Sequence, residues 1–256
     1  MAAWSPAQYL RFEDERTRPA ADLLARVPLA APARILDVGC GPGNSTELLA
    51  RRYPDAAITG IDSSPEMIAA ARSRLPGAAF AVADIATYRA PDPVSLVFGN
   101  AVFQWVPDHL EVVARLFAAC PAGGVLALQV PDNRGEPTHA LMEAVARDGP
   151  WHAKFATPIA RDPIPPPAAY YDRLRPLAAA TDIWHTAYHH VLADADAIVD
   201  WVRGTGLRPW LDRLDPAERA AYLDDYTARI AAAYPPLADG RVLLRFPRLF
   251  VVAVRA

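Results

Sequence analysis

The chain has 256 residues, 52% of them hydrophobic and 21% charged, and its formal net charge at pH 7 is −3. This composition is ordinary for a globular protein, and the small negative charge argues against a general electrostatic attraction to nucleic acid. Lys154 is the only lysine, so a P-loop, which needs a Gly-Lys-Ser/Thr triplet, is excluded. The same scarcity makes pyridoxal-phosphate chemistry a poor candidate, since that cofactor is held through a lysine.

The two cysteines and the N-terminal residues indicate the cellular compartment in which the protein is expected. Cys40 and Cys120 fit no metal-ligand spacing, and we expect two small buried thiols rather than a disulfide or a metal site. No basic region followed by an apolar core opens the sequence, and no run of about 18 apolar residues occurs. We therefore expect a cytoplasmic protein without a membrane segment, and a monomer.

The N-terminal segment carries helix signals. Ser5 can cap a helix, and Pro6 suits the first helical position. Pro19 is expected to open a second helix that runs through Leu24. We expect residues 1–30 to form a helical lid.

A glycine-rich turn follows the first expected strand, which covers residues 34–38. Its glycines are Gly39, Gly41 and Gly43. Glycine lets the backbone turn tightly and lets a ligand approach atoms that a Cβ would shield. Asn44 is expected to cap the next helix, because Glu47 three residues later completes a capping-box pattern. Such a loop after the first parallel strand commonly holds a nucleotide-like cofactor.

Short apolar runs alternate with helical patterns over residues 31–130. The expected strands cover residues 34–38, 57–62, 78–83, 94–98 and 125–130. Helices are expected at 45–52, from Ser63 or Ser64 with Pro65 onward, and at 107–119. This alternation predicts an α/β fold with a doubly wound parallel sheet, and residues 31–130 as its cofactor-binding core.

The rhythm changes after Val130. The pattern predicts one amphipathic helix at 138–147 and a proline-rich loop at 150–168. A sixth strand is expected at 182–191 and a seventh at 249–254, with helices between them at 194–203, from Leu207 and at 215–233. We expect a single domain in which residues 131–180 and 194–245 form cap insertions.

The spacing of the glycine loop narrows the choice of cofactor. A dinucleotide fingerprint requires Gly-x-Gly-x-x-Gly, and Asn44 occupies the place of the third glycine. Asp62 ends the second strand, where a carboxylate can accept hydrogen bonds from both hydroxyls of a ribose. Asp37 can order the loop or meet a cationic group, while Asp84 and Ile85 suit an adenine amino group and ring face. A nucleotide-like cofactor without a pyrophosphate fits these residues.

Four motifs stand in order along this region. They are Asp37-Val-Gly-Cys-Gly-Pro-Gly43, Asp62, Asp84-Ile85 and Asn100-Ala101. Together they resemble the class I S-adenosylmethionine-dependent methyltransferases, whose sheet has seven strands with an antiparallel seventh, in a Rossmann-like fold. The resemblance implies S-adenosyl-L-methionine as cofactor and S-adenosyl-L-homocysteine as product. The implied cofactor-binding residues are Asp37, Gly39, Gly41, Gly43, Asn44, Asp62, Ser63, Asp84, Ile85, Asn100 and Ala101.

Further segments extend the resemblance over nearly the whole chain. They lie at residues 4–19, 43–46, 60–65, 103–109, 129–133, 182–184, 200–201, 205–211 and 246–250. They are similar to a family within this class that methylates a carboxylate of a small polycarboxylate to a monomethyl ester. A carboxylate with a pKa near ~4 is already ionised at neutral pH, so we assign no catalytic acid or base.

Acceptor binding then requires cations and a shaped lining. Arginine is the residue for bidentate carboxylate binding, and 25 of the 26 basic residues are arginines. The acceptor-binding residues that we expect are Tyr9, Arg16, Arg18, Gln104, Trp105, His189, Trp201, Arg208, Trp210 and Arg245.

Three alternatives remain open at this stage. A small-molecule O- or N-methyltransferase with a different acceptor would keep the fold and the cofactor but would usually need a base, His189 or His109. A regulatory module that binds S-adenosylmethionine without catalysis would lack a cationic acceptor site. A nucleic-acid methyltransferase is weaker, because residues 100–103 are not the Asn/Asp-Pro-Pro-aromatic motif that such enzymes often carry.

Overall fold

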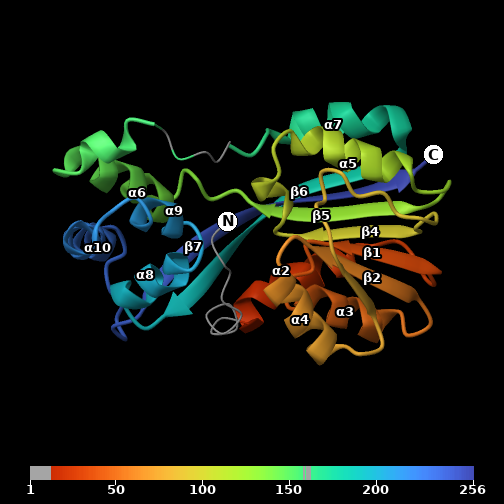
Figure 1. The fold of residues 1–256 in the computed structure, drawn as a ribbon, viewed down its shortest axis with the longest axis horizontal. Coiled ribbons are helices and arrows are strands. Elements are labelled where there is room, and N and C mark those ends of the chain that lie inside the picture. The colour runs from red at the N-terminus through yellow and green to blue at the C-terminus, as the bar shows by residue number, and fades with distance from the viewer. Residues whose placement is uncertain (1–12, 158, 160–162) are drawn as a thin grey trace. The chain divides into compact units, whose positions relative to one another are not determined.

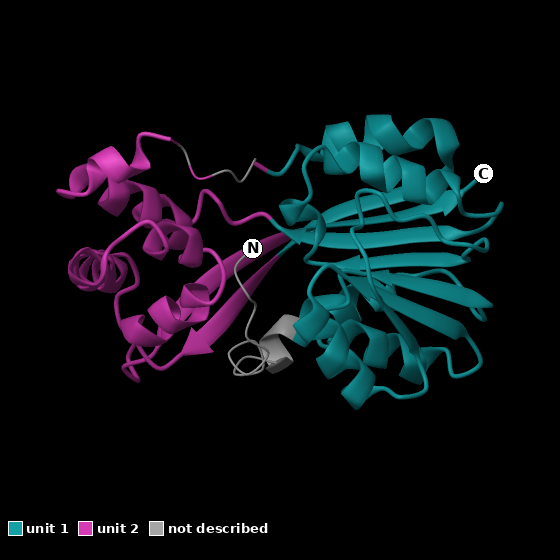
Figure 2. Cartoon of the chain, viewed as in Figure 1, with its two compact units in different colours: residues 1–131, 164–186, 249–256 teal, residues 132–163, 187–248 magenta. Residues whose placement is uncertain are grey.

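The computed structural model describes residues 13–157, 159 and 163–256, with the side chains of residues 13–16 outside the description. The helix start predicted at Ser5 therefore lies outside the described residues. The chain divides into two compact units, which Figure 2 shows in teal and magenta. Unit 1 comprises residues 1–131, 164–186 and 249–256, and unit 2 comprises residues 132–163 and 187–248.

A seven-stranded sheet organises the fold, with the strand order β3-β2-β1-β4-β5-β7-β6. The strands are β1 Arg34–Val38, β2 Ala57–Asp62, β3 Ala79–Val82, β4 Leu96–Asn100, β5 Val125–Pro131, β6 Ala178–Leu192 and β7 Val242–Arg255. The pairs β1–β2, β1–β4, β2–β3 and β4–β5 are parallel. The strand order reverses at β1, which is the position where open α/β sheets bind ligands.

The last strand runs antiparallel to β5. At one end Gly123 N donates to Arg255 O at 2.9 Å, and Arg255 N donates to Gly124 O at 2.7 Å. At the other end Asp132 N donates to Pro247 O at 3.0 Å. Residue numbers fall along β7 as they rise along β5, which defines an antiparallel pair. The predicted seven-stranded, mostly parallel architecture is confirmed.

Helices cover both faces of the sheet in unit 1. In Figure 1, α5 His109–Ala118 and α7 Pro167–Leu174 lie on one face, and α2 Glu13–Ala25, α3 Asn44–Arg52 and α4 Pro65–Arg74 lie on the other. Every residue of β5 is buried, and β1 is exposed only at its first residue. Strands covered on both faces are mostly apolar, which explains the hydrophobic residues of β1, β4 and β5.

Two predicted helix starts are wrong. Pro19 lies inside α2 rather than at the start of a second helix, and it is buried together with Ala20 and Leu23. Packing of this apolar stripe against unit 1 outweighs the preference of proline for a first turn. Asn44 does not cap α3, because it is the first helical residue and the cap is Gly43 in a left-handed conformation. Ser64, in contrast, caps α4 as expected, accepting a hydrogen bond from Met67 N at 3.2 Å.

The segment between residues 150 and 180 contains more structure than the sequence indicates. Pro167 opens α7 in a stretch expected to be loop, and β6 begins at Ala178, before the predicted strand. Residues 164–186 belong to compact unit 1, whereas the cap insertion that we expect covers residues 131–180 and stays a prediction. Tyr170 on α7 is fully buried, which supplies the apolar surface that orders this segment. Short 3-10 helices complete the chain: η1 Phe103–Trp105, η2 His152–Phe155 and η3 Arg175–Leu177.

Unit 2 is built from helices and the distal parts of β6 and β7. The helices are α6 Pro137–Asp148, α8 Ala195–Arg203, α9 Arg208–Leu211 and α10 Pro216–Ala233. Asp194 caps α8, and Asp215 forms a full capping box with Glu218 at the start of α10. The buried Tyr222 donates from its hydroxyl to Met142 O at 2.7 Å, which fixes α10 against α6.

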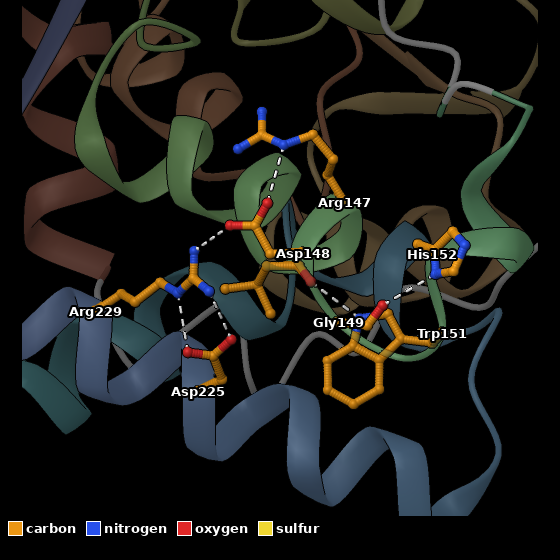
Figure 3. A network of polar contacts seen from close by, with 8 residues as sticks. Arg147, Asp148, Gly149, Trp151, His152, Asp225 and Arg229 are labelled. Carbon is orange, nitrogen blue, oxygen red and sulfur yellow. Dashed lines mark hydrogen bonds and ion pairs between the residues drawn. The ribbon is translucent and has the colours of Figure 1, made fainter.

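An ion-pair network also joins α6 to α10 (Figure 3). The Arg229 guanidinium donates from Nη1 to Asp148 Oδ2 at 2.8 Å and from Nε to Asp225 Oδ1 at 2.9 Å. Beneath it Trp151 Nε1 donates to Val145 O at 3.0 Å. Since the charged groups are partly exposed, each pair contributes at most about 1 kcal/mol, and the buried tyrosines and Trp151 carry most of the packing. No helix in the described part of the chain is long and apolar enough to cross a membrane.

Candidate functional site

The register of the parallel strands brings the predicted cofactor motifs to one edge of the sheet. Val38 at the end of β1 is level with Ile61 of β2 and with Gly99 of β4. Asp62 is level with Val82, the last residue of β3. The four strands therefore end together, and the turns that follow them lie at the carboxyl edge where α/β sheets bind ligands.

The glycine loop needs its glycines for two different reasons. Gly39, Gly41 and Gly43 all have positive φ, at 66°, 55° and 93°. A Cβ on Gly39 would lie 2.3 Å from Cγ2 of Val102, so the turn after β4 packs directly on this loop. A Cβ on Gly41 would meet no atom of the described residues within 4 Å, so these residues leave space open above it.

Asp62 fastens the loop to the end of β2. Its Oδ2 accepts from Gly41 N at 3.0 Å, and its Oδ1 accepts from Ser64 N at 2.9 Å. Ser63 between them is exposed. The carboxylate of Asp62 is only half-buried, so its remaining lone pairs can accept hydrogen bonds from a ligand.

Asp37 is fully buried inside β1. Its Oδ2 accepts from Ser45 Oγ at 2.8 Å and from Thr46 Oγ1 at 2.6 Å, both from the first turn of α3. Its Oδ1 has no hydrogen-bond partner among the described residues. The pKa of Asp37 is raised to about 7, and burial is the largest cause. The hydrogen bonds from Thr46 and Ser45 lower this pKa, while the negative charge of Asp62 raises it.

The third motif forms a turn after β3. Asp84 Oδ1 accepts from Ala86 N at 2.8 Å, and the main chain of Asp84 accepts from Tyr88 N at 2.8 Å. Asp84 itself is exposed, whereas Ile85 belongs to the hydrophobic core of unit 1. Asp84 therefore orders its own turn, and a contact with adenine stays a prediction for both residues.

The turn after β4 is held by glutamine side chains. Gln129 Nε2 donates to Asn100 Oδ1 at 2.6 Å, and Gln104 Nε2 donates to Ala101 O at 2.6 Å. Ala101 has a φ of 56°, a left-handed conformation that the surrounding hydrogen bonds maintain. Trp105 follows with 42% of its surface exposed, as a large aromatic beside the motif.

Three side chains that could act as a nucleophile or a base, two cysteines and one histidine, are buried in the fold. Cys40 and Cys120 are buried free thiols, as expected, and burial raises the pKa of each. His109 is buried at the start of α5 and its Nε2 lies 2.7 Å from the hydroxyl of Tyr170 on α7. Burial lowers the pKa of His109, and the hydrogen bond ties its ring to Tyr170. The described residues contain no group of three or more His, Cys, Asp or Glu side chains that could hold a metal ion.

The residues expected to bind the acceptor fall into three sets. Tyr9 and the side chain of Arg16 lie outside the described residues, while Arg18 is exposed on α2. Gln104 and Trp105 lie in the turn after β4 in unit 1. The other five belong to unit 2 and are His189, Trp201, Arg208, Trp210 and Arg245.

Within unit 2 these five residues differ in environment. Trp201 is buried, and its ring centroid lies 4.7 Å from that of His190. Arg208 pairs with Asp212 on α9 at 3.6 Å, and Arg245 pairs with Glu136. The ring of Trp210 lies 5.4 Å from that of Phe155, and His189 is exposed on β6. Their part in acceptor binding stays a prediction.

Some site residues were not singled out from the sequence. Ser45 and Thr46 hold Asp37, and Gln129 holds Asn100. The signal for Gln129 was present: it is the one polar residue in the apolar run of β5.

Known proteins resemble this chain over its whole length. A family model described as a methyltransferase domain matches residues 35–124. A trans-aconitate 2-methyltransferase of Rhodopseudomonas palustris (strain BisB18) is 60% identical over 256 residues, covering 100% of both chains. One of Methylobacterium radiotolerans is 60% identical over 262 residues, again with 100% of both chains covered. The chain belongs to the trans-aconitate 2-methyltransferase family.

This membership confirms the resemblance found in the sequence motifs. The protein is an enzyme of the S-adenosylmethionine-dependent methyltransferases, and S-adenosylmethionine is its cofactor. Identity extends over the full length, so it includes unit 2 as well as the cofactor-binding region. The hypothesis of a regulatory module without catalysis is therefore set aside.

Solved structures agree on the fold. YcgJ of Bacillus subtilis has a TM-score of 0.60 at 12% identity, covering 93% of this chain and 98% of its own. The [4+2]-cyclase SpnF has a TM-score of 0.53 at 15% identity, covering 94% and 82%. SpnF is named as a cyclase, so this fold alone does not determine the chemistry.

Proposed function

We propose that this enzyme transfers the methyl group of S-adenosylmethionine to a carboxylate of trans-aconitate and forms a monomethyl ester. The single observation that carries the proposal is the full-length identity of 60% to proteins named trans-aconitate 2-methyltransferase. The cofactor motifs at the carboxyl edge of the sheet support the proposal. The chemistry agrees as well, because an ionised carboxylate needs no general base.

The residues at the carboxyl edge suit this cofactor. Asp37 Oδ1, which has no hydrogen-bond partner in the described part of the chain, can receive a cationic ammonium group. The space that the described residues leave above Gly41 admits a ligand close to the main chain. Asp62 stands at the end of β2, where ribose hydroxyls can donate to it. When bound, S-adenosylmethionine supplies an electrophilic methyl group on a sulfonium.

The enzyme's own contribution is then binding, orientation and desolvation of the acceptor. An ionised carboxylate needs no proton removed, so direct displacement proceeds without a general base. Placing the two reactants in line and removing water from the anion supply the rate enhancement. This agrees with His109, which is buried and hydrogen-bonded to Tyr170 rather than poised as a base.

The product's chemistry tests this proposal. A carboxylate methyl ester releases methanol on mild alkaline treatment, whereas an N-methyl product or a phenol ether does not. Protein incubated with methyl-labelled S-adenosylmethionine and trans-aconitate should give a label that alkali converts to volatile methanol. Label that resists alkali would contradict esterification and favour a different small-molecule acceptor.

Arginine variants test how the remaining carboxylates are bound. Arg18→Ala, Arg208→Ala and Arg245→Ala should raise the KM for trans-aconitate about tenfold where the arginine binds substrate, since a charged pair is lost. Affinity for S-adenosylhomocysteine, measured by calorimetry, should not change. An unaltered KM would show that the substituted arginine does not bind the substrate. The expected monomeric state stays a prediction that light scattering can check.

A further inference from the structure

A hydrogen-bonded amide pair stands at the end of β4. Asn100 and Gln129 are direct partners in the β4–β5 register, so their side chains leave the same face of the sheet. Gln129 is fully buried, and its Nε2 donates to Asn100 Oδ1 at 2.6 Å. Its main-chain oxygen also accepts from Ala101 N at 2.9 Å. One residue of β5 therefore fixes two successive residues at the end of β4.

This pair lies beside the cofactor motifs. Asp37 is level with Phe98, two residues before Asn100, so Asp37 and Asn100 share a face of the sheet. Val102, two residues further on, packs against the position that only a glycine can occupy at Gly39. Asn100 is thus part of the carboxyl edge, next to the glycine loop.

The pairing decides which end of the Asn100 amide is available. A primary amide has an acceptor oxygen and an NH2 group with two donor hydrogens. Because Gln129 donates to Oδ1, that oxygen is engaged with β5, and the NH2 group is the other end of the Asn100 amide. An ionised carboxylate oxygen requires such a donor, whereas a neutral amine or hydroxyl that must lose a proton requires an acceptor.

We propose that Asn100 donates a hydrogen bond to the methyl-accepting carboxylate, and that Gln129 is the positioning residue that holds the amide in this orientation. The inference rests on the proposed function and deepens it, because it names the group that selects an anionic oxygen. The carboxylate oxygen forms its bond to the methyl carbon as the carbon–sulfur bond breaks, the bonding electron pair stays on sulfur, and no proton is transferred. The hydrogen bond from Asn100 orients that oxygen and disfavours amines.

Two substitutions separate this role from a structural one. Asn100→Asp keeps the side chain's shape and the bond from Gln129, because a carboxylate oxygen accepts it, but replaces the NH2 donors with a negative oxygen. The KM for trans-aconitate should rise about tenfold or more, while affinity for S-adenosylhomocysteine stays within about twofold. Gln129→Met keeps the volume and the main-chain bond to Ala101 but removes the side-chain donor, and it should raise the same KM by a smaller factor.

A charge-matched control accompanies them. Arg147→Gln in unit 2 changes the net charge by the same amount at a side chain that is 72% exposed, and it should leave both the KM and the cofactor affinity unchanged. Circular dichroism and thermal unfolding confirm that each variant is folded. If the Asp variant fails to fold, Gln129→Met is compared with wild type instead, using the same two measurements, the KM for trans-aconitate and the affinity for S-adenosylhomocysteine.

The outcomes divide clearly. A wild-type KM in Asn100→Asp would show that Asn100 does not donate to the acceptor and would overturn the inference while leaving the proposed function intact. A loss of cofactor affinity parallel to the rise in KM would assign Asn100 to the cofactor, as the sequence motif implied, and would also overturn it. A wild-type protein that esterifies no carboxylate would instead refute the proposed function.

Discussion

The buried carboxyl group of Asp37 predicts a pH-dependent stability that a single substitution removes. Burial raises the pKa of Asp37 from an ordinary value near 3.8 to about 7. Between these values the folded protein holds a proton that the unfolded chain has lost, so the free energy of unfolding falls as pH rises. Each pH unit costs about 1.4 kcal/mol, and the full interval is worth about 4 kcal/mol as an order of magnitude.

Asp37→Asn should abolish this dependence. The amide oxygen can still accept from Ser45 and Thr46, and the neutral NH2 replaces the partnerless Oδ1. Urea unfolding of both proteins without cofactor, at several values between pH 4.5 and pH 8, gives the difference in free energy, in which the other titrating groups cancel. We expect near equality at pH 4.5 and a variant more stable by about 3 kcal/mol at pH 8, because only the part of the interval above pH 4.5 contributes.

The same variant should bind S-adenosylhomocysteine more weakly, because a neutral amide loses the attraction of the carboxylate for an ammonium group. Calorimetry on the two folded proteins measures this at pH 8, where the wild-type carboxyl group is ionised. Two unfolding curves that stay parallel across the pH range would contradict the prediction, since they would show that Asp37 has an ordinary pKa in the folded protein.

Further substitutions test the loop and the packing. Gly39→Ala should destabilise the protein by about 1–3 kcal/mol in urea unfolding, because it combines a positive φ with an overlap on the turn after β4. Gly41→Ala meets no neighbour, so it should cost only about 1 kcal/mol while weakening cofactor binding in calorimetry. Tyr170→Phe should cost about 1–3 kcal/mol, because it leaves the buried His109 without its partner, and thermal unfolding measures the loss. Arg229→Gln should cost about 1 kcal/mol or less, since its ion pairs are partly exposed; a larger loss in urea unfolding would contradict this assignment.

The sequence predicted the parallel core well because its strands are covered on both faces. That burial demands continuous apolar runs, such as the one in β1, and these are visible without a structure. The type of the glycine loop was equally predictable from the sequence, because the spacing of its glycines excludes a dinucleotide fingerprint. The family membership found by full-length identity bears out both interpretations.

Local rules failed where tertiary packing decides. The local pattern predicts a helix start at Pro19 and a loop at Pro167, yet buried neighbours place Pro19 inside α2 and Pro167 at the start of α7. Asparagine is a residue type that favours helix caps, but at the start of α3 the left-handed Gly43 occupies the cap position in place of Asn44. The amide pair of Asn100 and Gln129 joins residues 29 positions apart, and only the strand register shows that they face one another.

Methyl transfer to a carboxylate of trans-aconitate is tested most directly by acceptor preference. Purified protein is incubated with labelled S-adenosylmethionine and, separately, with trans-aconitate, cis-aconitate, citrate and isocitrate, and the alkali-labile label is counted. We expect esterification of trans-aconitate in preference to the other three acids. Inert polycarboxylates together with a methylated phenol or amine would contradict the proposed function, while leaving the fold and the cofactor assignment in place.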